Sequence, residues 1–147
     1  MDYLKHPSVE TWETRQSWFE NKNEELQEIG SHFLSEQACA LAMEIEKCFC
    51  AGAWVSVIIL SLTAIDAHLR ETETMDYAIN TKKLFEELGL GEEYQQLRKK
   101  RNELIHVKED NPALTVDQQW DNREELEAEA KKAVEQMFKV FYSNPGT

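Results

Sequence analysis

The stretch CFCAGAWVSVIILSLTAI, residues 48–65, decides the fold of this chain because it is long, apolar and free of charge. Its length approaches that of a membrane-spanning helix. Gly52 lies near its start and is typical of a turn, and the apolar run that remains is too short to cross a bilayer. Lys47 and Asp66 bracket the stretch without a flanking basic loop. We therefore expect one helix to end near Gly52 and a second, buried helix to follow.

Helical periodicity extends from this stretch in both directions. The preceding helix is expected from about Ser35 to Ala51, and the following helix from about Ala53 to Thr72. The apolar seam of the first helix consists of Leu34, Ala38, Leu41, Ile45 and Cys48. The seam of the second consists of Val55, Ile58, Leu62, Ile65 and Leu69, and is widened nearly all the way round by Val57, Ile59, Leu60 and Ala64. Such a helix lies at the centre of a bundle or covers a second surface, for example a dimer interface.

The remaining segments are also mostly helical in pattern. Residues 8–29 indicate one amphipathic helix or two short ones, residues 81–90 a short helix, and residues 92–106 a longer helix that carries a basic cluster. Pro112 disfavours helix and places a loop before Thr115, which forms a capping box with Gln118 at the start of the last helix. The seam of that helix is Leu126, Ala130, Ala133, Met137 and Val140 with Phe141.

These segments predict an all-α fold. The chain has only 5 Gly and 3 Pro among 147 residues, and no alternating apolar pattern of strands. We expect an antiparallel four-helix bundle with an additional N-terminal helix and a short helix before the helix of residues 92–106. Residues 1–30 are expected to form the N-terminal helical extension, and residues 31–147 the bundle domain.

Charge and cysteine content limit the classes of function. The formal net charge is −12 and the pI is near 4.8, which argues against general duplex-DNA binding but not against a local site for single-stranded nucleic acid. The N-terminus lacks the apolar region of a signal peptide, so we expect a cytoplasmic protein without a membrane span. Cys39, Cys48 and Cys50 lack zinc-site spacing and are interpreted as buried thiols in a reducing compartment.

The segment LRKKRNELIH, residues 97–106, departs from the acidic character of the chain. The apolar seam of its helix runs through Tyr94, Leu97 and Leu104, and the seam position between Leu97 and Leu104 is Arg101. A guanidinium there needs a carboxylate, a solvent cleft or a bound anion. Arg101 and His106 are roughly 140° apart on a regular helix, so they do not point at one atom. Either the helix ends near His106, or Arg101 reaches round the surface, or a symmetric partner completes a site.

Two simpler interpretations of this segment stay open. A histidine at the C-terminal end of a helix is a favourable partner for the helix dipole. The basic residues from Arg98 to Arg101 form a solvated face if they pair with Glu92 and Glu93. Asn102 and His106 share a helix face, and Arg98 extends the same line.

The pattern of Arg101, Asn102, three residues and His106 resembles the signature of the HEPN (higher eukaryotes and prokaryotes nucleotide-binding) superfamily. The preceding AGAWVSVIILSLTAIDAHLRE is similar to the second helix of that family, with Asp66 at its acidic position. The resemblance covers roughly residues 34–141. The family often has a small residue after the histidine, where this chain has Val107.

The resemblance implies a metal-independent ribonuclease of a toxin, defence or stress-effector type, without a cofactor or a metal site. His106 would act as general acid or base, Arg101 would stabilise the phosphate, and Asn102 would orient one of them. Because the motif has one histidine, a homodimer would bring two copies together. Asp66 either pairs with Arg101 or is a plain surface acid. A positive mouth for single-stranded RNA would be formed by Arg98, Lys99, Lys100 and Lys108.

Other partners and functions are compatible with the same residues. An antitoxin is one suggested partner. In a second interpretation the chain is a non-catalytic dimeric module that binds a nucleotide or protein and works with a nucleotidyltransferase. A third interpretation, an unrelated helical bundle, predicts a monomer in which Arg101 is paired locally and His106 is exposed. His68 and Glu44 are weaker candidates, and a structural role is favoured for both.

Overall fold

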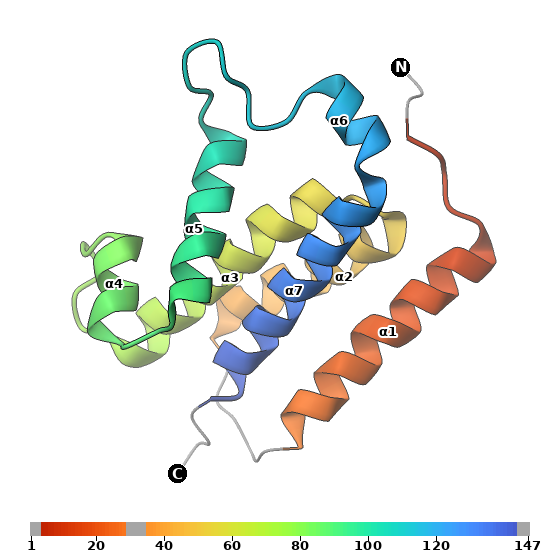
Figure 1. The fold of residues 1–147 in the computed structure, drawn as a ribbon. Coiled ribbons are helices and arrows are strands. Elements are labelled where there is room, and N and C mark those ends of the chain that lie inside the picture. The colour runs from red at the N-terminus through yellow and green to blue at the C-terminus, as the bar shows by residue number, and fades with distance from the viewer. Residues whose placement is uncertain (1–3, 29–34, 144–147) are drawn as a thin grey trace.

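The computed structural model describes residues 4–28 and 35–143. These residues form the helices α1 (Val9–Gln27), α2 (Glu36–Ala51), α3 (Trp54–Glu73), α4 (Thr81–Glu87), α5 (Glu92–Ile105), α6 (Val116–Asp121) and α7 (Arg123–Phe141), shown in Figure 1. The β-bridging found among them is one isolated pair, Lys108 with Asn111. The prediction of an all-α fold is confirmed for the described residues.

The turn at Gly52 joins α2 to α3, and these two helices pack against each other. Gly52 has φ +77°, the left-handed conformation that favours glycine at the end of a helix, and its amide donates to carbonyls of the last turn of α2. Ser35 caps the other end of α2, since its hydroxyl accepts from the amide of Ala38. The predicted break in the apolar stretch is therefore confirmed. No helix within the described residues has the length and apolar character that crossing a bilayer requires.

Helix α3 lies at the centre of the bundle and packs against α2, α5 and α7. Its buried positions include Val57, Ile58, Leu62, Ala64 and Ile65, which lie on several sides of the helix. The central position explains the broad apolar surface of this helix, and that surface is used inside the chain. Val55, Ile59 and Leu60 of the same helix stay partly exposed.

Helices α3 and α7 run in the same direction. Arg123 at the start of α7 bonds to Gly52 before α3, and Phe141 at the end of α7 packs against His68 near the end of α3. Figure 1 shows that α5 crosses α3 rather than lying along its whole length. The helices thus form a bundle around α3, whereas the HEPN-like arrangement stays a prediction.

The N-terminal segment is one helix rather than two. Ser8 caps α1 by accepting a hydrogen bond from the amide of Thr11. The helix packs on α2 and α7, and it buries Phe19 in the same core as Phe49 and Phe138. Leu34 and the expected domain boundary at residues 30 and 31 lie outside the described residues.

The expectation of a single last helix was wrong. The capping box of Thr115 and Gln118 is present, but it starts the short helix α6, which ends at Asp121. Asn122 leaves the helical conformation with φ −99° and ψ 31°, and α7 begins at Arg123. Aspartate and asparagine side chains compete for backbone hydrogen bonds and weaken a helix here. The Nη2 of Arg123 also donates to the carbonyl of Gly52, which fixes the start of α7.

Candidate functional site

Helix α5 carries the basic segment and buries Tyr94 and Leu97 against the bundle. The next position on this seam is Arg101, whose side chain is partly buried, and Leu104 packs partly against the core. The seam therefore has the order that the sequence indicates, with a guanidinium in place of an apolar side chain. Ile105 at the end of the helix is 47% exposed.

The guanidinium of Arg101 is bonded to the neighbouring residue on the same helix. Its Nε and Nη2 donate to Oδ1 of Asn102 at 3.3 and 3.2 Å. Burial lowers the pKa of Arg101, the negative charge of Asp66 opposes this change, and the positive charge of Arg98 adds to it. Asn102 is thus the direct partner of this arginine, while Asp66 acts through space.

Asp66, in the second half of α3, links this helix to the start of α4. Its Oδ2 accepts from Nε of Arg70 at 2.8 Å, and its Oδ1 accepts from the hydroxyl of Thr81 at 3.0 Å. Arg70 also donates to the carbonyls of Tyr77 and Ile79 in the connection between these helices. The carboxylate therefore organises the α3–α4 corner beside Arg101, a role that neither interpretation of the sequence included.

His106 lies where α5 ends. The helix stops at Ile105, and His106 takes an extended conformation with φ −126° and ψ 115° while its amide still donates to the carbonyl of Asn102 at 3.0 Å. Its exposed side chain lines a hollow of about 120 Å³. The other residues that line this hollow are Glu103, Lys108, Asn111 and Ala113. Of the possibilities that the sequence left open, the helix end at His106 is the one found.

Arg101 and His106 do not share that hollow. The lining residues of the hollow do not include Arg101, which instead contacts Asn102 on the same helix. Lys108 is the basic residue that lies beside His106, because the chain turns between Lys108 and Asn111 and the amide of Asn111 donates to the carbonyl of Lys108 at 3.1 Å.

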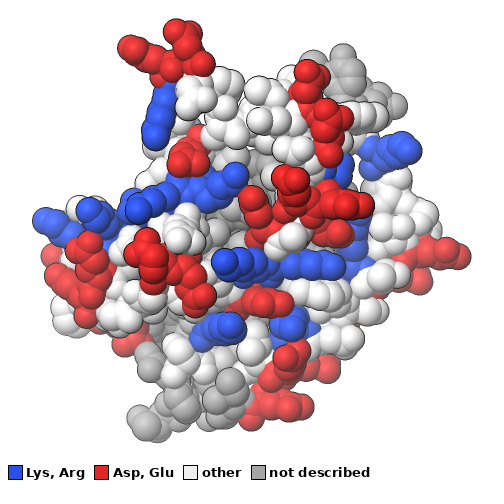
Figure 2. All heavy atoms as spheres, in the orientation of Figure 1, with Lys and Arg blue, Asp and Glu red and all other residues white. Residues whose placement is uncertain are grey.

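Three of the four basic residues assigned to an RNA-binding mouth, Arg98, Lys99 and Lys100, have local partners. Lys99 lies 4.0 Å from a carboxylate oxygen of Glu92, and Lys100 lies 3.5 Å from one of Glu129 on α7. Arg98 donates to Oε1 of Gln95 at 2.8 Å. Figure 2 shows basic side chains over α4 and α5 interleaved with acidic ones. Exposed pairs of this kind are weak and exchange readily for other partners, so the positive field is local.

The weaker candidates have different surroundings. His68 is buried, and its ring lies 5.2 Å from that of Phe141. Burial lowers its pKa, an effect that the charge of Glu73 opposes, and its Nδ1 is without a hydrogen-bond partner among the described residues. Glu44 is exposed on α2. In the part of the chain that the structure describes, no group of three or more His, Cys, Asp or Glu residues could hold a metal ion.

A second, larger hollow lies away from α5 and was not predicted from the sequence. It has a volume of about 560 Å³ and is lined by residues of α1, α6 and α7 and of the α2–α3 turn, including Arg15 and Arg123. These arginines are more than 100 positions apart in the sequence. The sequence around Arg15 and Arg123 is that of ordinary polar helices, so nothing marks either arginine as a site residue. The only local feature of the hollow that the sequence shows is the turn at Gly52, beside which both guanidinium groups lie.

The fold and site define an all-helical protein with an Arg101–Asn102 pair and a histidine at the end of the same helix. Comparisons with protein families, with curated proteins and with solved structures find no match to this chain.

Proposed function

We propose that this chain is a metal-independent endoribonuclease, of a toxin, defence or stress-effector type, that acts as a homodimer on single-stranded RNA. The observation that carries the proposal is the position of His106. This histidine leaves the helix at its last turn, is exposed, and lines a hollow together with Lys108. An imidazole that is open to solvent and beside a cation suits proton transfer at an RNA phosphate.

The chemistry would be a transesterification within the RNA strand. One imidazole takes the proton from the 2′-hydroxyl, the 2′-oxygen bonds to phosphorus, and the bond from phosphorus to the 5′-oxygen breaks. An imidazolium gives a proton to that leaving oxygen. The products are a 2′,3′-cyclic phosphate and a 5′-hydroxyl. Arg101 would stabilise the charge on the phosphate oxygens, with the N–H groups that Asn102 does not occupy.

A second copy of the chain would supply what one copy lacks. The reaction uses one acid and one base, and the motif has one histidine. In a two-fold dimer, His106 of each copy would face the other, and the Arg101 of one copy would approach the His106 of its partner. Ile105 and Val107, which flank His106, are 47% and 82% exposed. Exposed apolar side chains around a polar group favour an interface at this end of α5.

Cleavage of mixed RNA in the presence of EDTA tests the proposal. Wild type is expected to cleave, and both His106→Ala and Arg101→Ala are expected to be slower by about a hundredfold or more. Glu109→Gln, an exposed change in the loop beside His106, is the control that should keep the wild-type rate. Absence of cleavage by wild type, or cleavage at the wild-type rate by both alanine variants, would falsify the ribonuclease assignment.

A second candidate function follows from the position of Arg101. Its guanidinium is partly buried, bonded to Asn102, and separate from the hollow of His106. This arrangement favours a non-catalytic HEPN-like dimer that holds a nucleotide or a protein, with a nucleotidyltransferase as one suggested partner. Such a module would bind labelled RNA or nucleotide without cleaving it, and Arg101→Ala would weaken that binding.

The mass of the protein in solution separates both proposals from an unrelated bundle. Light scattering is expected to give twice the chain mass of 17.1 kDa at micromolar concentration. Val107→Asp, which puts a charge at the proposed interface, is expected to shift the protein toward a monomer. A wild-type monomer at every concentration would rule out the composite site.

A further inference from the structure

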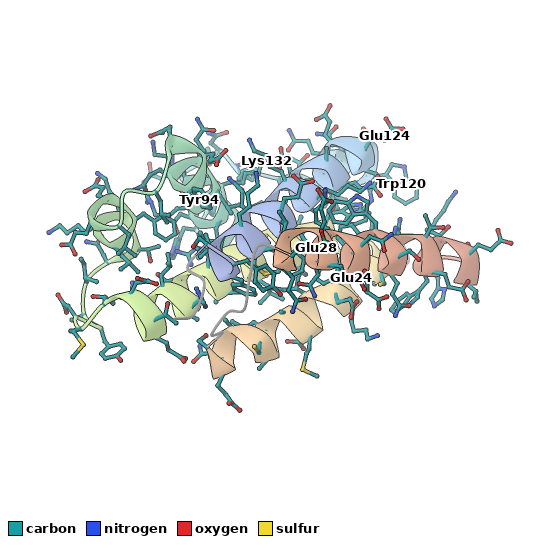
Figure 3. The ribbon with its side chains drawn as sticks, turned by 90° about the horizontal axis from the view of Figure 1, so that it is seen from below. Glu24, Glu28, Tyr94, Trp120, Glu124 and Lys132 are labelled. Atoms are coloured by element: carbon teal, nitrogen blue, oxygen red, sulfur yellow. The ribbon has the colours of Figure 1, made fainter. Side chains whose placement is uncertain are left out.

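The hollow of about 560 Å³ between α1, the α2–α3 turn, α6 and α7 has the size of a small-molecule pocket. It lies outside the α5 site. Four helices supply Arg15, Trp54, Trp120, Arg123, Glu124 and Glu127, and the segment before α1 adds the positive charge of Lys5. Figure 3 shows Trp120 and Glu124 at the same end of the molecule.

Two guanidinium groups meet at the wall of this pocket. Nη1 of Arg15 donates to the carbonyl of Cys50 at 3.2 Å, and Nη2 of Arg123 donates to the carbonyl of Gly52. Burial lowers the pKa of Arg123, and the positive charge of Arg15 lowers it further. The two cations are thus held close together in a partly desolvated position.

The pairing of these arginines with helix α2 leaves much of their hydrogen-bonding capacity unused. Both cap the C-terminal carbonyls of α2, where the helix dipole favours positive charge. A guanidinium has five N–H donors. Arg15 uses Nη1 for its hydrogen bond within the protein. Arg123 uses Nη1, which donates to Oε1 of Gln119, and Nη2, which donates to Gly52. Among the described residues, neither arginine has a carboxylate within 4.0 Å, so an anion would find free donors here.

The same pocket has aromatic walls. The guanidinium carbon of Arg15 lies 4.8 Å from the ring centroid of Trp54, a contact that holds the fork in place. Trp120 of the short helix α6 also lines the pocket and is 51% exposed, which leaves part of its indole open for a planar group. A flat aromatic ring would stack there, and its charged substituent would reach the arginines.

Two carboxylates limit the charge of the ligand. Glu124 and Glu127 line the pocket, and the charge of Glu127 raises the pKa of Arg123 against the effect of burial. These acids offset part of the positive charge, so a group with one or two negative charges fits better than a polyanion such as RNA. We propose that this pocket binds a small organic anion in which a planar aromatic ring carries one carboxylate or one phosphate group.

Calorimetric titration of the full chain with phenyl phosphate, benzoate and phenol tests this proposal. Saturable binding of phenyl phosphate or of benzoate is expected in the millimolar range or tighter, and phenol should bind at least about tenfold more weakly. Binding of phenyl phosphate alone assigns the natural ligand to the phosphates, and binding of benzoate alone assigns it to the carboxylates. Equal binding of phenol, or no saturable binding of either anion, would overturn the proposal.

Variants place the binding in this pocket. Arg123→Gln is expected to weaken binding about tenfold, whereas Lys139→Gln, which removes the same charge from an exposed position of α7 outside the pocket, should leave it unchanged. Trp120→Ala changes a half-exposed side chain and should also weaken binding, so the test survives if Arg123→Gln fails to fold. Glu124→Gln should tighten binding severalfold. A loss with Lys139→Gln, or full affinity in Trp120→Ala, would contradict the assignment, independently of the ribonuclease test.

Discussion

The guanidinium of Arg101 donates two hydrogen bonds to a single oxygen, Oδ1 of Asn102, the next residue in the chain. This contact holds the arginine fork at the surface of α5 while leaving other N–H groups for a phosphate. The pair is the part of the proposed site that one copy of the chain contains fully assembled. A change of charge at position 102 should therefore affect how Arg101 binds a phosphate.

Asn102→Asp is expected to weaken RNA binding about tenfold, because a carboxylate beside Arg101 competes with the phosphate and neutralises the guanidinium. Asn102→Ala removes the anchor without adding charge and should have a smaller effect on binding. Fluorescence anisotropy with a labelled single-stranded oligonucleotide measures both. Equal affinity of Asn102→Asp and wild type would show that Arg101 does not contact the phosphate.

The second prediction concerns the hydrogen bond between Asp66 and Thr81, and it is tested by stability rather than by activity. The Asp66 carboxylate accepts from Thr81 and Arg70, so Asp66→Asn and Thr81→Val are each expected to lower the free energy of unfolding by about 1–2 kcal/mol. Because the two residues share a hydrogen bond, the double variant should lose less than the sum. Urea unfolding gives the three values. Strict additivity would mean that the Asp66–Thr81 contact contributes nothing.

His68 makes the stability depend on pH in a definite direction. Burial lowers the pKa of His68 in the folded chain, while the unfolded chain keeps its ordinary pKa of about 6.5. The unfolded state therefore binds more protons below that pH, and the free energy of unfolding falls as pH decreases through about 6.5. Urea unfolding at pH 7.5 and 5.5 measures the loss.

His68→Phe keeps a ring against Phe141 and removes the titrating group. The loss of stability between the two pH values should therefore be smaller in His68→Phe than in wild type. His106→Ala removes an exposed histidine and serves as the control, with the wild-type loss. An unchanged pH dependence in His68→Phe would contradict the assignment to His68.

Gly52 and Gly89 offer a matched pair of left-handed glycines. Both have positive φ, +77° and +68°, so alanine at either position is strained by about 1–2 kcal/mol. A Cβ at Gly52 would also meet Nη1 of Arg15 at 2.9 Å, whereas nothing lies within 4 Å of a Cβ at Gly89. Gly52→Ala should thus be the more destabilising change in thermal or urea unfolding. The difference should shrink when Arg15→Gln is added, and a larger effect at Gly89 would contradict the packing described here.

The sequence predicted those parts of the fold that depend on local chemistry. The glycine turn, the capping box at Thr115, and the seams of α3 and α7 follow from residue type and spacing, and the structure contains them. The break at Asn122 was missed because the polar run from Asp117 to Glu125 reads as continuous helix. The contact that fixes the break, Arg123 to Gly52, joins residues 71 positions apart.

The candidate site divides in the same way. The unusual position of Arg101 on an apolar seam was visible in the sequence, and so was the end of the helix near His106. The direct partner of Arg101, the attachment of Asp66 to Arg70 and Thr81, and the pairing of Lys100 with Glu129 depend on side-chain directions and on the packing of α7. Spacing along one helix does not determine such contacts.

The chemistry of the RNA ends tests the central claim most directly. Wild type and His106→Ala are incubated with a single-stranded RNA in EDTA, and with the same sequence made with 2′-deoxyribose, and the product ends are analysed by mass spectrometry. We predict 2′,3′-cyclic phosphate and 5′-hydroxyl ends from RNA with wild type, at least about a hundredfold less product with His106→Ala, and no cleavage of the deoxy strand. Ends with a 3′-hydroxyl and a 5′-phosphate, or equal product from His106→Ala, would contradict it.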